Sequence, residues 1–227
     1  MRWLAAFAAT ALFAAGASAG TLGSVERVCP FTGTKFSGRI DLSGTRFCVR
    51  LDLKPIGPIG APPELPVCPD DGFIVFKEKF TAAELDRLRP WVGSDEFRAL
   101  TASESTYYRY AETLRRLGQS DQVAWRLVQA TWQVDRDREK YARYAAAAVK
   151  ELETLAANRD MVMLAAELQR RTGQFDQARL KLEGLQKQEG LPEGLRANVE
   201  RELQFVGEHD STRHYMQADE ERCKELD

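Results

Sequence analysis

Two short fragments near the start of the chain combine cysteine, proline and glycine at the same spacing. They are residues 29–33, with the sequence CPFTG, and residues 68–72, with the sequence CPDDG. Each resembles half of a zinc knuckle, Cys-x-x-Cys-Gly, in which two thiolates on a tight turn hold one side of a tetrahedral Zn²⁺. Thr32 and Asp71 stand where the second cysteine of each knuckle belongs. The spacing therefore indicates the turns of a zinc-binding module without two of its thiolates.

The rest of the sequence shows no recognisable catalytic set. The two histidines, His209 and His214, are five residues apart on an expected helix, so their side chains point about 140° apart. They are poor co-ligands for a metal, and we interpret them as surface histidines. Neither a phosphate-binding glycine loop nor a dinucleotide fingerprint is present. We therefore expect a protein without enzymatic activity and without a cofactor.

The first residues predict export. Arg2 is followed by an apolar run over residues 3–15 and by Ala17-Ser18-Ala19, the pattern of a secretory signal peptide cleaved after Ala19. The run is shorter than the ~20 residues that a membrane span requires, so we expect no stable membrane insertion of the mature chain. An even number of cysteines, four, favours disulfides in an oxidising compartment, and we expect a periplasmic location.

The charge pattern bears on the partner. The chain has 32 Lys and Arg against 34 Asp and Glu, a net charge of −2, and no block of one sign. Binding to nucleic acid needs a concentrated cationic face, so nucleic acid is excluded as the expected partner. A protein or peptide partner is the remaining expectation.

Composition divides the chain after the signal peptide into two parts. Residues 20–80 are rich in glycine and proline, which predicts a loop-rich, zinc-ribbon-like module with short strands at 47–51 and 72–76. Residues 81–227 predict a helical domain that opens with the capping box Thr81-x-x-Glu84, and Pro90 is expected to end the first helix. The predicted fold class is mainly α, with a small β module first.

An internal repeat organises the helical part. Residues 111–122 and 166–177 are identical at eight of twelve positions, with an offset of 55. Each copy reads as a helix, a stop at Gly118 or Gly173, and a second helix with an apolar stripe. Such antiparallel hairpins bury their apolar faces only by stacking, as in tetratricopeptide-like arrays. We expect further helices over 137–157, 193–206 and 211–226, with the small module capping one end of the array.

Two sets of side chains are candidates for partner binding. Tyr107 and Tyr108 lie in the aromatic-rich first hairpin and either belong to the core or anchor a peptide. The paired arginines of the two repeat copies either hold acidic groups or cover a solvated helix face; they are Arg115, Arg116, Arg170 and Arg171.

The order of these motifs resembles the bacterial family known as domain of unknown function 2225. The segment around Cys29 looks like its first knuckle, Phe47-Cys48 like its mid-module cysteine, and residues 164–185 like its most recognisable helical stretch. The resemblance covers nearly the whole mature chain. It implies a knuckle module followed by tetratricopeptide-like helices and leaves the function open.

If the two knuckles still face each other, Cys29 and Cys68 lie close enough for a disulfide. Cys48 and Cys223 are then left to pair with each other. Two alternatives remain open: inert buried thiols, or zinc held by Cys29, Cys48, Cys68 and Asp71. The leading function is a non-enzymatic interaction or scaffold protein, and the alternative is a metal-binding or thiol-redox protein.

Overall fold

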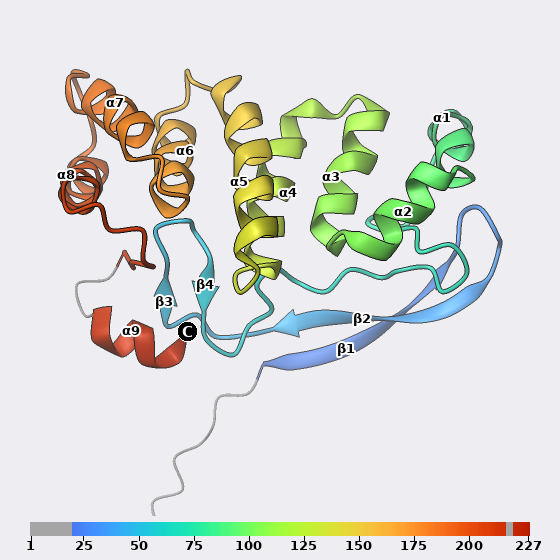
Figure 1. The fold of residues 1–227 in the computed structure, drawn as a ribbon. Coiled ribbons are helices and arrows are strands. Elements are labelled where there is room, and N and C mark those ends of the chain that lie inside the picture. Colours follow the sequence, from blue (N-terminus) through green and yellow to red (C-terminus); the bar gives the residue numbers. More distant parts are fainter. Residues whose placement is uncertain (1–19, 217–219) are drawn as a thin grey trace, which may run out of the picture.

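The computed structural model describes residues 20–216 and 220–227 of the chain. These residues form a mainly helical protein whose small antiparallel β segments come first in the sequence (Figure 1), which confirms the predicted fold class. The predicted signal peptide, residues 1–19, lies outside the described residues.

The β segments form two separate antiparallel pairs. Strands β1 (Thr21–Val28) and β2 (Lys35–Ser43) make a long ribbon, while β3 (Cys48–Val49) and β4 (Pro55–Ile56) make a short one. The sequence interpretation missed the long ribbon, because β1 shows no buried residue that would create an apolar alternation. The strand expected at 47–51 is limited to β3 and a bridge between Arg50 and Tyr215, and the strand expected at 72–76 to a single bridge between Val67 and Ile74.

The helices follow in the order α1 (Ala82–Val92), α2 (Asp95–Ser103), α3 (Thr106–Leu117), α4 (Ser120–Gln133), α5 (Arg138–Glu153), α6 (Arg159–Arg171), α7 (Phe175–Gln186), α8 (Glu193–Gly207) and α9 (Glu220–Leu226). From α3 to α8 each helix packs against the next one along the chain, so these six helices stand side by side in an array (Figure 1).

The repeat has a structural counterpart in the hairpins α3–α4 and α6–α7. Gly118 and Gly173 end the first helices with φ values of 75° and 77°, the left-handed conformation that glycine adopts without strain. Leu127 and Leu182, which are 55 residues apart, are both fully buried on the second helices. The repeat therefore encodes two hairpins with the same turn and the same buried face.

Two helix predictions are wrong. Helix α1 continues past Pro90 to Val92, because a proline in the last turn removes only one hydrogen bond while the neighbouring Trp91 and Val92 are buried. The helix expected over residues 211–226 is limited to α9. Residues 211–216 are not helical, since their backbone bonds to the β module: the Met216 N–H donates to the Val49 carbonyl at 2.8 Å, and the Leu51 N–H donates to the His214 carbonyl at 2.9 Å.

The β segments and α9 lie along one side of the helical array (Figure 1), so the expectation that the module caps one end is also wrong. The physical reason is a shared core. Ile74 belongs to the apolar cluster of α3 to α6, and Phe73 packs in the cluster that holds Leu88 and Trp91 of α1. Because the module contributes to the helical core along its length, the two parts pack as one body.

Candidate functional site

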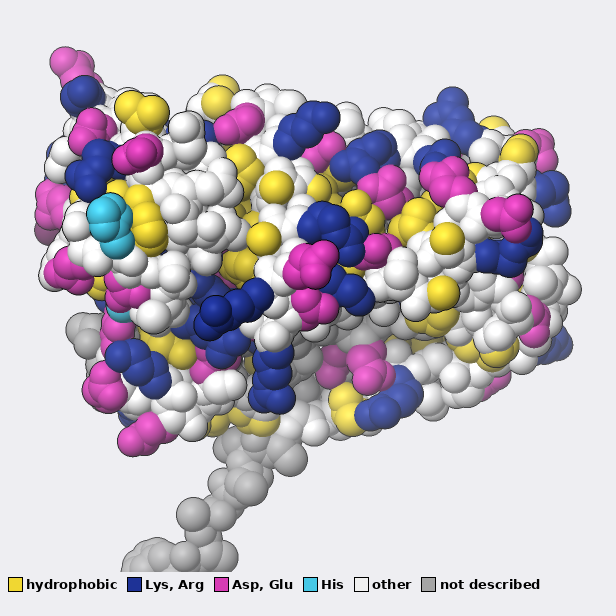
Figure 2. Space-filling view, viewed as in Figure 1, with side chains coloured by type: hydrophobic (Ala, Val, Ile, Leu, Met, Phe, Trp, Pro, Cys, Tyr) yellow, Lys and Arg dark blue, Asp and Glu magenta, His cyan; other side chains and the backbone are white. Residues whose placement is uncertain are grey.

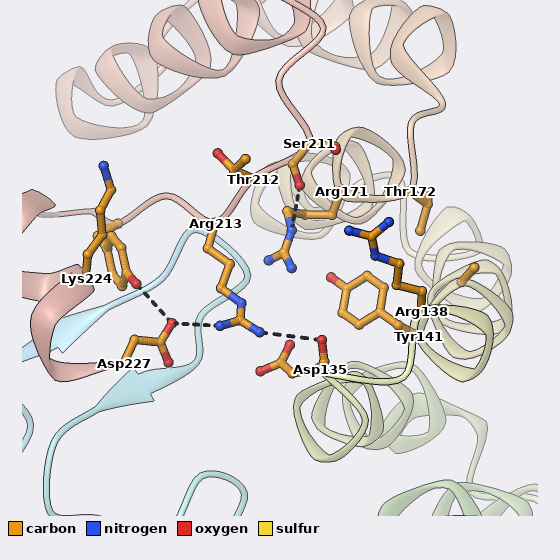
Figure 3. A pocket seen from close by; sticks show the side chains of 12 residues that line it. Asp135, Arg138, Tyr141, Arg171, Thr172, Ser211, Thr212, Arg213, Lys224 and Asp227 are labelled. Atoms are coloured by element: carbon orange, nitrogen blue, oxygen red, sulfur yellow. Dashed lines mark hydrogen bonds and ion pairs between the residues drawn. The ribbon is translucent and has the colours of Figure 1, made fainter.

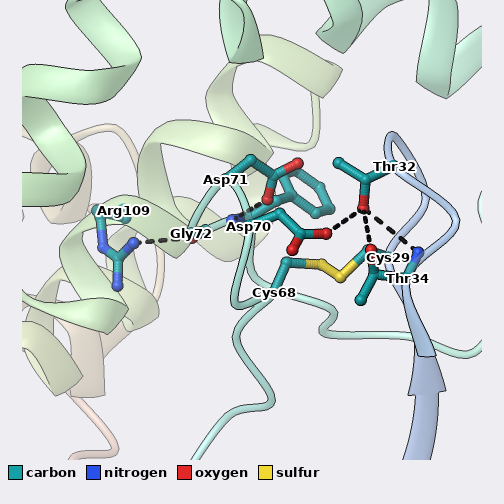
Figure 4. The surroundings of a disulfide bond; sticks show 9 residues. Cys29, Thr32, Thr34, Cys68, Asp70, Asp71, Gly72 and Arg109 are labelled. Carbon is teal, nitrogen blue, oxygen red and sulfur yellow. Dashed lines mark hydrogen bonds between the residues drawn. A yellow bond between two sulfur atoms is a disulfide. The ribbon is translucent and has the colours of Figure 1, made fainter. Parts of the chain in front are cut away.

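The two half-knuckles form matching turns (Figure 4). In the first, the Cys29 N–H donates to the Thr34 carbonyl and the Gly33 N–H donates to the Cys29 carbonyl, both at 2.8 Å. In the second, the corresponding bonds run from Cys68 to Phe73 at 2.8 Å and from Gly72 to Cys68 at 2.9 Å. Both glycines have φ near 77°, at 78° and 76°. The chain thus keeps the backbone geometry of a paired knuckle.

A disulfide joins the two turns where a metal would otherwise link them. Cys29 and Cys68 are bonded, with their Cα atoms 5.6 Å apart, and both are buried. Cys48 and Cys223 form the second bond, with Cα atoms 5.8 Å apart. Both expected pairings are therefore present, and the second attaches α9 to β3.

Thr32 and Asp71, which stand at the missing cysteine positions, form hydrogen bonds within and between the two turns. The Thr32 hydroxyl donates to the Asp70 carboxylate at 2.7 Å, and hydrogen bonds from Thr34 and Thr32 lower the pKa of Asp70. The Asp71 carboxylate accepts from the Phe73 N–H at 2.8 Å, and burial raises its pKa.

The four-ligand zinc set considered from the sequence is not assembled. Cys48 lies in a different apolar cluster, with Cys223, and is bonded to it rather than facing Cys29 and Cys68. Within the described residues, no group of three or more His, Cys, Asp and Glu is arranged to hold a metal ion.

The tyrosines proposed as anchors are mostly engaged inside the protein. Tyr107 is buried and its hydroxyl donates to the Pro63 carbonyl at 2.9 Å, while burial raises its pKa to about 12. Tyr108 is half-buried and stacks on Tyr144, with ring centroids 4.4 Å apart. Tyr107 is therefore a core residue that ties the module to α3, and of the two only Tyr108 is partly accessible.

The four arginines have different surroundings. Arg115 pairs on the surface with Glu112 and, at 2.8 Å, with Glu151. Arg116 pairs with Glu96 and lies over the ring of Trp91, 4.4 Å from its centroid.

Arg170 is completely buried, so it does not face solvent or a partner. Its guanidinium contacts Glu167 at 2.7 Å and Glu202 at 2.9 Å, and donates to the carbonyls of Asp210 and Thr212. Burial raises the pKa of Glu202 well above its usual value, with the neighbouring Glu167 adding to the effect. Arg170 thus holds the segment after α8 against α6.

Arg171, the fourth arginine, lines a cleft between the array and the C-terminal segment (Figure 3). The cleft has a volume of about 860 Å³ and takes its lining from the start of α5, the end of α6, residues 211–215 and α9. Figure 2 shows Lys and Arg side chains gathered on this part of the surface, where the helical array meets the β segments and α9. The cationic residues of the lining are Arg138, Arg171, Arg213 and Lys224.

A buried ion cluster includes Asp135, which lines the cleft. Arg50, which is almost fully buried, pairs with Asp52 and with Asp135 at 2.7 Å, and Lys54 reaches Asp135 at 2.8 Å. Burial alone would raise the pKa of Asp135, but the hydrogen bonds and charges of Arg50 and Lys54 lower it to about 2. Asp135 therefore stays ionised and fixes the start of α5 to the β module.

His214 is buried, contrary to the interpretation of both histidines as surface residues. Its ring stacks on Phe205 at 3.6 Å between centroids, and its two nitrogens lie 2.9 Å from Asp210 and 3.0 Å from Glu220. The segment after α8 is not helical, so the helix geometry used for the prediction does not apply. His209 is exposed, as expected.

Comparisons of the chain with family models, with curated proteins and with solved structures found no match. The resemblance to the domain of unknown function 2225 family therefore stays a prediction. Among the described residues, none of the helices is both long enough and apolar enough to span a bilayer. The two disulfides fit an exported protein.

Proposed function

We propose that the protein is a non-enzymatic interaction protein whose helical array and C-terminal segment together present a binding site for a protein or peptide. The observation that carries this proposal is the cleft of about 860 Å³ where α5, α6, α9 and residues 211–215 meet. Ligand sites in proteins occupy about 300–1,000 Å³ and form where structural elements converge, and this cleft has both properties.

The cleft has fixed walls, which favours binding without a large ordering cost. The Cys48–Cys223 bond attaches α9 to the β module, and Arg170 holds residues 210 and 212 against α6. Two walls of the cleft that are far apart in sequence are thus held by a covalent bond and by a buried charge.

The proposed location is the periplasm, after cleavage of a signal peptide following Ala19. An oxidising compartment would maintain the two disulfides on which the walls depend. Membership of the domain of unknown function 2225 family is part of the same proposal and rests on the motif order, from the knuckle at Cys29 to the helical stretch at 164–185.

Crosslinking capture from the extracytoplasmic fraction of the source cells tests the proposal. The bait is the mature chain, residues 20–227, and the matched control is the same chain after reduction and alkylation of its four cysteines. We expect a discrete partner that is enriched by the folded bait and not by the control. Recovery of no partner by the folded bait after crosslinking would contradict the proposal.

A further inference from the structure

Three hydrogen-bond donors face the cleft without an acceptor. Tyr141 is only 6% exposed, yet its hydroxyl has no hydrogen-bond partner among the described residues. Arg171 donates through Nε to the Ser211 carbonyl at 3.2 Å, but its buried Nη1 has no partner in the same set. Arg138 forms no hydrogen bond or ion pair with any described residue. The Tyr141 hydroxyl and the Arg171 Nη1 are buried donors without partners, which is costly, so they indicate a site for an acceptor, and the exposed Arg138 lines the same cleft.

These donors converge on one space (Figure 3). The guanidinium groups of Arg138, Arg171 and Arg213 and the hydroxyl of Tyr141 turn toward the middle of the cleft, while Lys224 lies apart from them. The Arg171 guanidinium lies 5.1 Å from the centroid of the Tyr141 ring, which orients both groups. The arrangement presents N–H and O–H donors from two helices to a single ligand.

The acidic residues of the cleft do not neutralise Arg138 and Arg171. Asp135 is paired with Arg50 and Lys54, and Asp227 lies within 3.8 Å of Arg213. The carboxylate of Asp227 also accepts from the Tyr215 hydroxyl at 2.9 Å. Arg138 and Arg171 therefore have no acidic partner among the described residues that line the cleft, and the charge of the partly buried Arg171 interacts more strongly there than in open water.

The protonation of Tyr141 supports its role as a donor. Burial raises the pKa of Tyr141 above its usual value, and the nearby Arg171 charge opposes the shift only in part. The phenol thus keeps its proton at neutral pH and offers an O–H donor between two cations. Donors of this kind are matched by an oxyanion.

We propose that this cleft binds the carboxylate of an acidic peptide segment, with Arg138 and Arg171 as the cationic donors and Tyr141 as the neutral donor. The proposal rests on the proposed function and specifies its ligand. The planar guanidinium fork matches the two oxygens of a carboxylate. A volume of about 860 Å³ exceeds what one carboxylate fills, which leaves room in the cleft for neighbouring parts of a peptide.

Fluorescence anisotropy with labelled tetraglutamate and tetraglutamine tests the proposal on the mature chain. We expect tetraglutamate to bind at least tenfold more tightly than tetraglutamine. The double variant Arg138→Gln/Arg171→Gln should lose at least tenfold in affinity for tetraglutamate, and Tyr141→Phe should lose two- to fivefold. Equal binding of the two peptides, or full binding by the double variant, would overturn the proposal.

The control is Arg115→Gln/Arg116→Gln, which also removes two positive charges and includes Arg116, the repeat equivalent of Arg171; it should leave tetraglutamate affinity unchanged. Urea unfolding midpoints of all variants identify any loss of folding. The single variant Arg138→Gln is the least disruptive test, because Arg138 forms no hydrogen bond or ion pair with a described residue. Competition by free succinate at concentrations that displace tetraglutamate fully would assign the site to small dicarboxylates and overturn the peptide assignment. If the double variant still captures the crosslinked partner, the inference fails while the proposed function stands.

Discussion

Arg170 and Arg115 occupy equivalent positions in the two repeat copies, 55 residues apart, yet only Arg170 is enclosed by protein. The Arg170 side chain is 0% exposed, whereas that of Arg115 is 41% exposed. Each pairs with a glutamate three residues earlier, Glu167 or Glu112. The difference comes from Glu202 and residues 210–212, which cover only the second copy.

Replacing Arg170 with methionine should destabilise the protein strongly. The change would leave Glu167 and Glu202 buried without their cation and would free two carbonyls, at a cost of about 3–5 kcal/mol. The matched change Arg115→Met removes an exposed pair and should cost less than about 1 kcal/mol. Urea unfolding at pH 7 gives both values, and equal costs for the two variants would show that the burial of Arg170 is unimportant.

The ion pairs of Asp135 predict a pH dependence. Its folded pKa of about 2 is below the ordinary value of 3.8, so the stabilisation is present above pH 4 and is lost as the pH falls toward 2. The shift corresponds to roughly 2 kcal/mol.

The variant Asp135→Asn should therefore be less stable than the parent by about 2 kcal/mol at pH 7, and the difference should shrink between pH 4 and pH 2. Urea unfolding measured at several pH values checks this expectation. A difference that stays constant down to pH 2 would mean that Asp135 is not held ionised by Arg50 and Lys54.

The two knuckle glycines provide a matched pair of substitutions. Both have positive φ, so alanine at either position costs about 1 kcal/mol from the left-handed backbone alone. At Gly33 a new Cβ meets nothing within 4 Å, whereas at Gly72 it would overlap the side chain of Thr101. We expect Gly72→Ala to cost about 3 kcal/mol and Gly33→Ala about 1 kcal/mol, because only the former adds overpacking. Thermal unfolding of the two variants would reveal the order, and a larger effect at Gly33 would contradict it.

The disulfides predict a thiol count and an order of stabilities. Alkylation followed by intact mass should find no free thiol before reduction and four after it. In the chain-entropy model, removing the bond across 39 residues by Cys29→Ser/Cys68→Ser costs about 4 kcal/mol.

Removing the bond across 175 residues by Cys48→Ser/Cys223→Ser should cost about 5 kcal/mol, since the closed loop is longer. Urea unfolding of the two double variants compares them. Alkylation of two or more thiols without reductant would contradict the two disulfides. Double variants as stable as the parent protein would show that the disulfides do not stabilise the module.

Local signals in the sequence predicted the local features well. Thr81 and Glu84 form the expected capping box, and Gly118 and Gly173 end their helices as expected, because a cap or a stop depends only on neighbouring residues. The long β1–β2 ribbon was missed because a strand with no buried residue leaves no periodic apolar pattern.

Long-range contacts explain what the sequence did not reveal. Arg50 and Asp135 are 85 residues apart, and nothing in their neighbours marks either of them as part of a buried ion cluster. Arg138, Tyr141 and Arg171 come together only because α5 and α6 pack side by side. The one sequence signal for this site was the Arg170-Arg171 pair. Of these two residues, Arg170 lies in the core and only Arg171 lines the cleft.

The Cys48–Cys223 bond joins two residues that are 175 positions apart in the sequence and so closes the chain between them into a covalent ring. A protease that cuts the backbone once between these two cysteines would leave its two products joined, so nicked and intact protein would have nearly the same mass until the bond is reduced. Because Cys223 is synthesised long after Cys48, this bond can form only after α9, one wall of the cleft, has been synthesised.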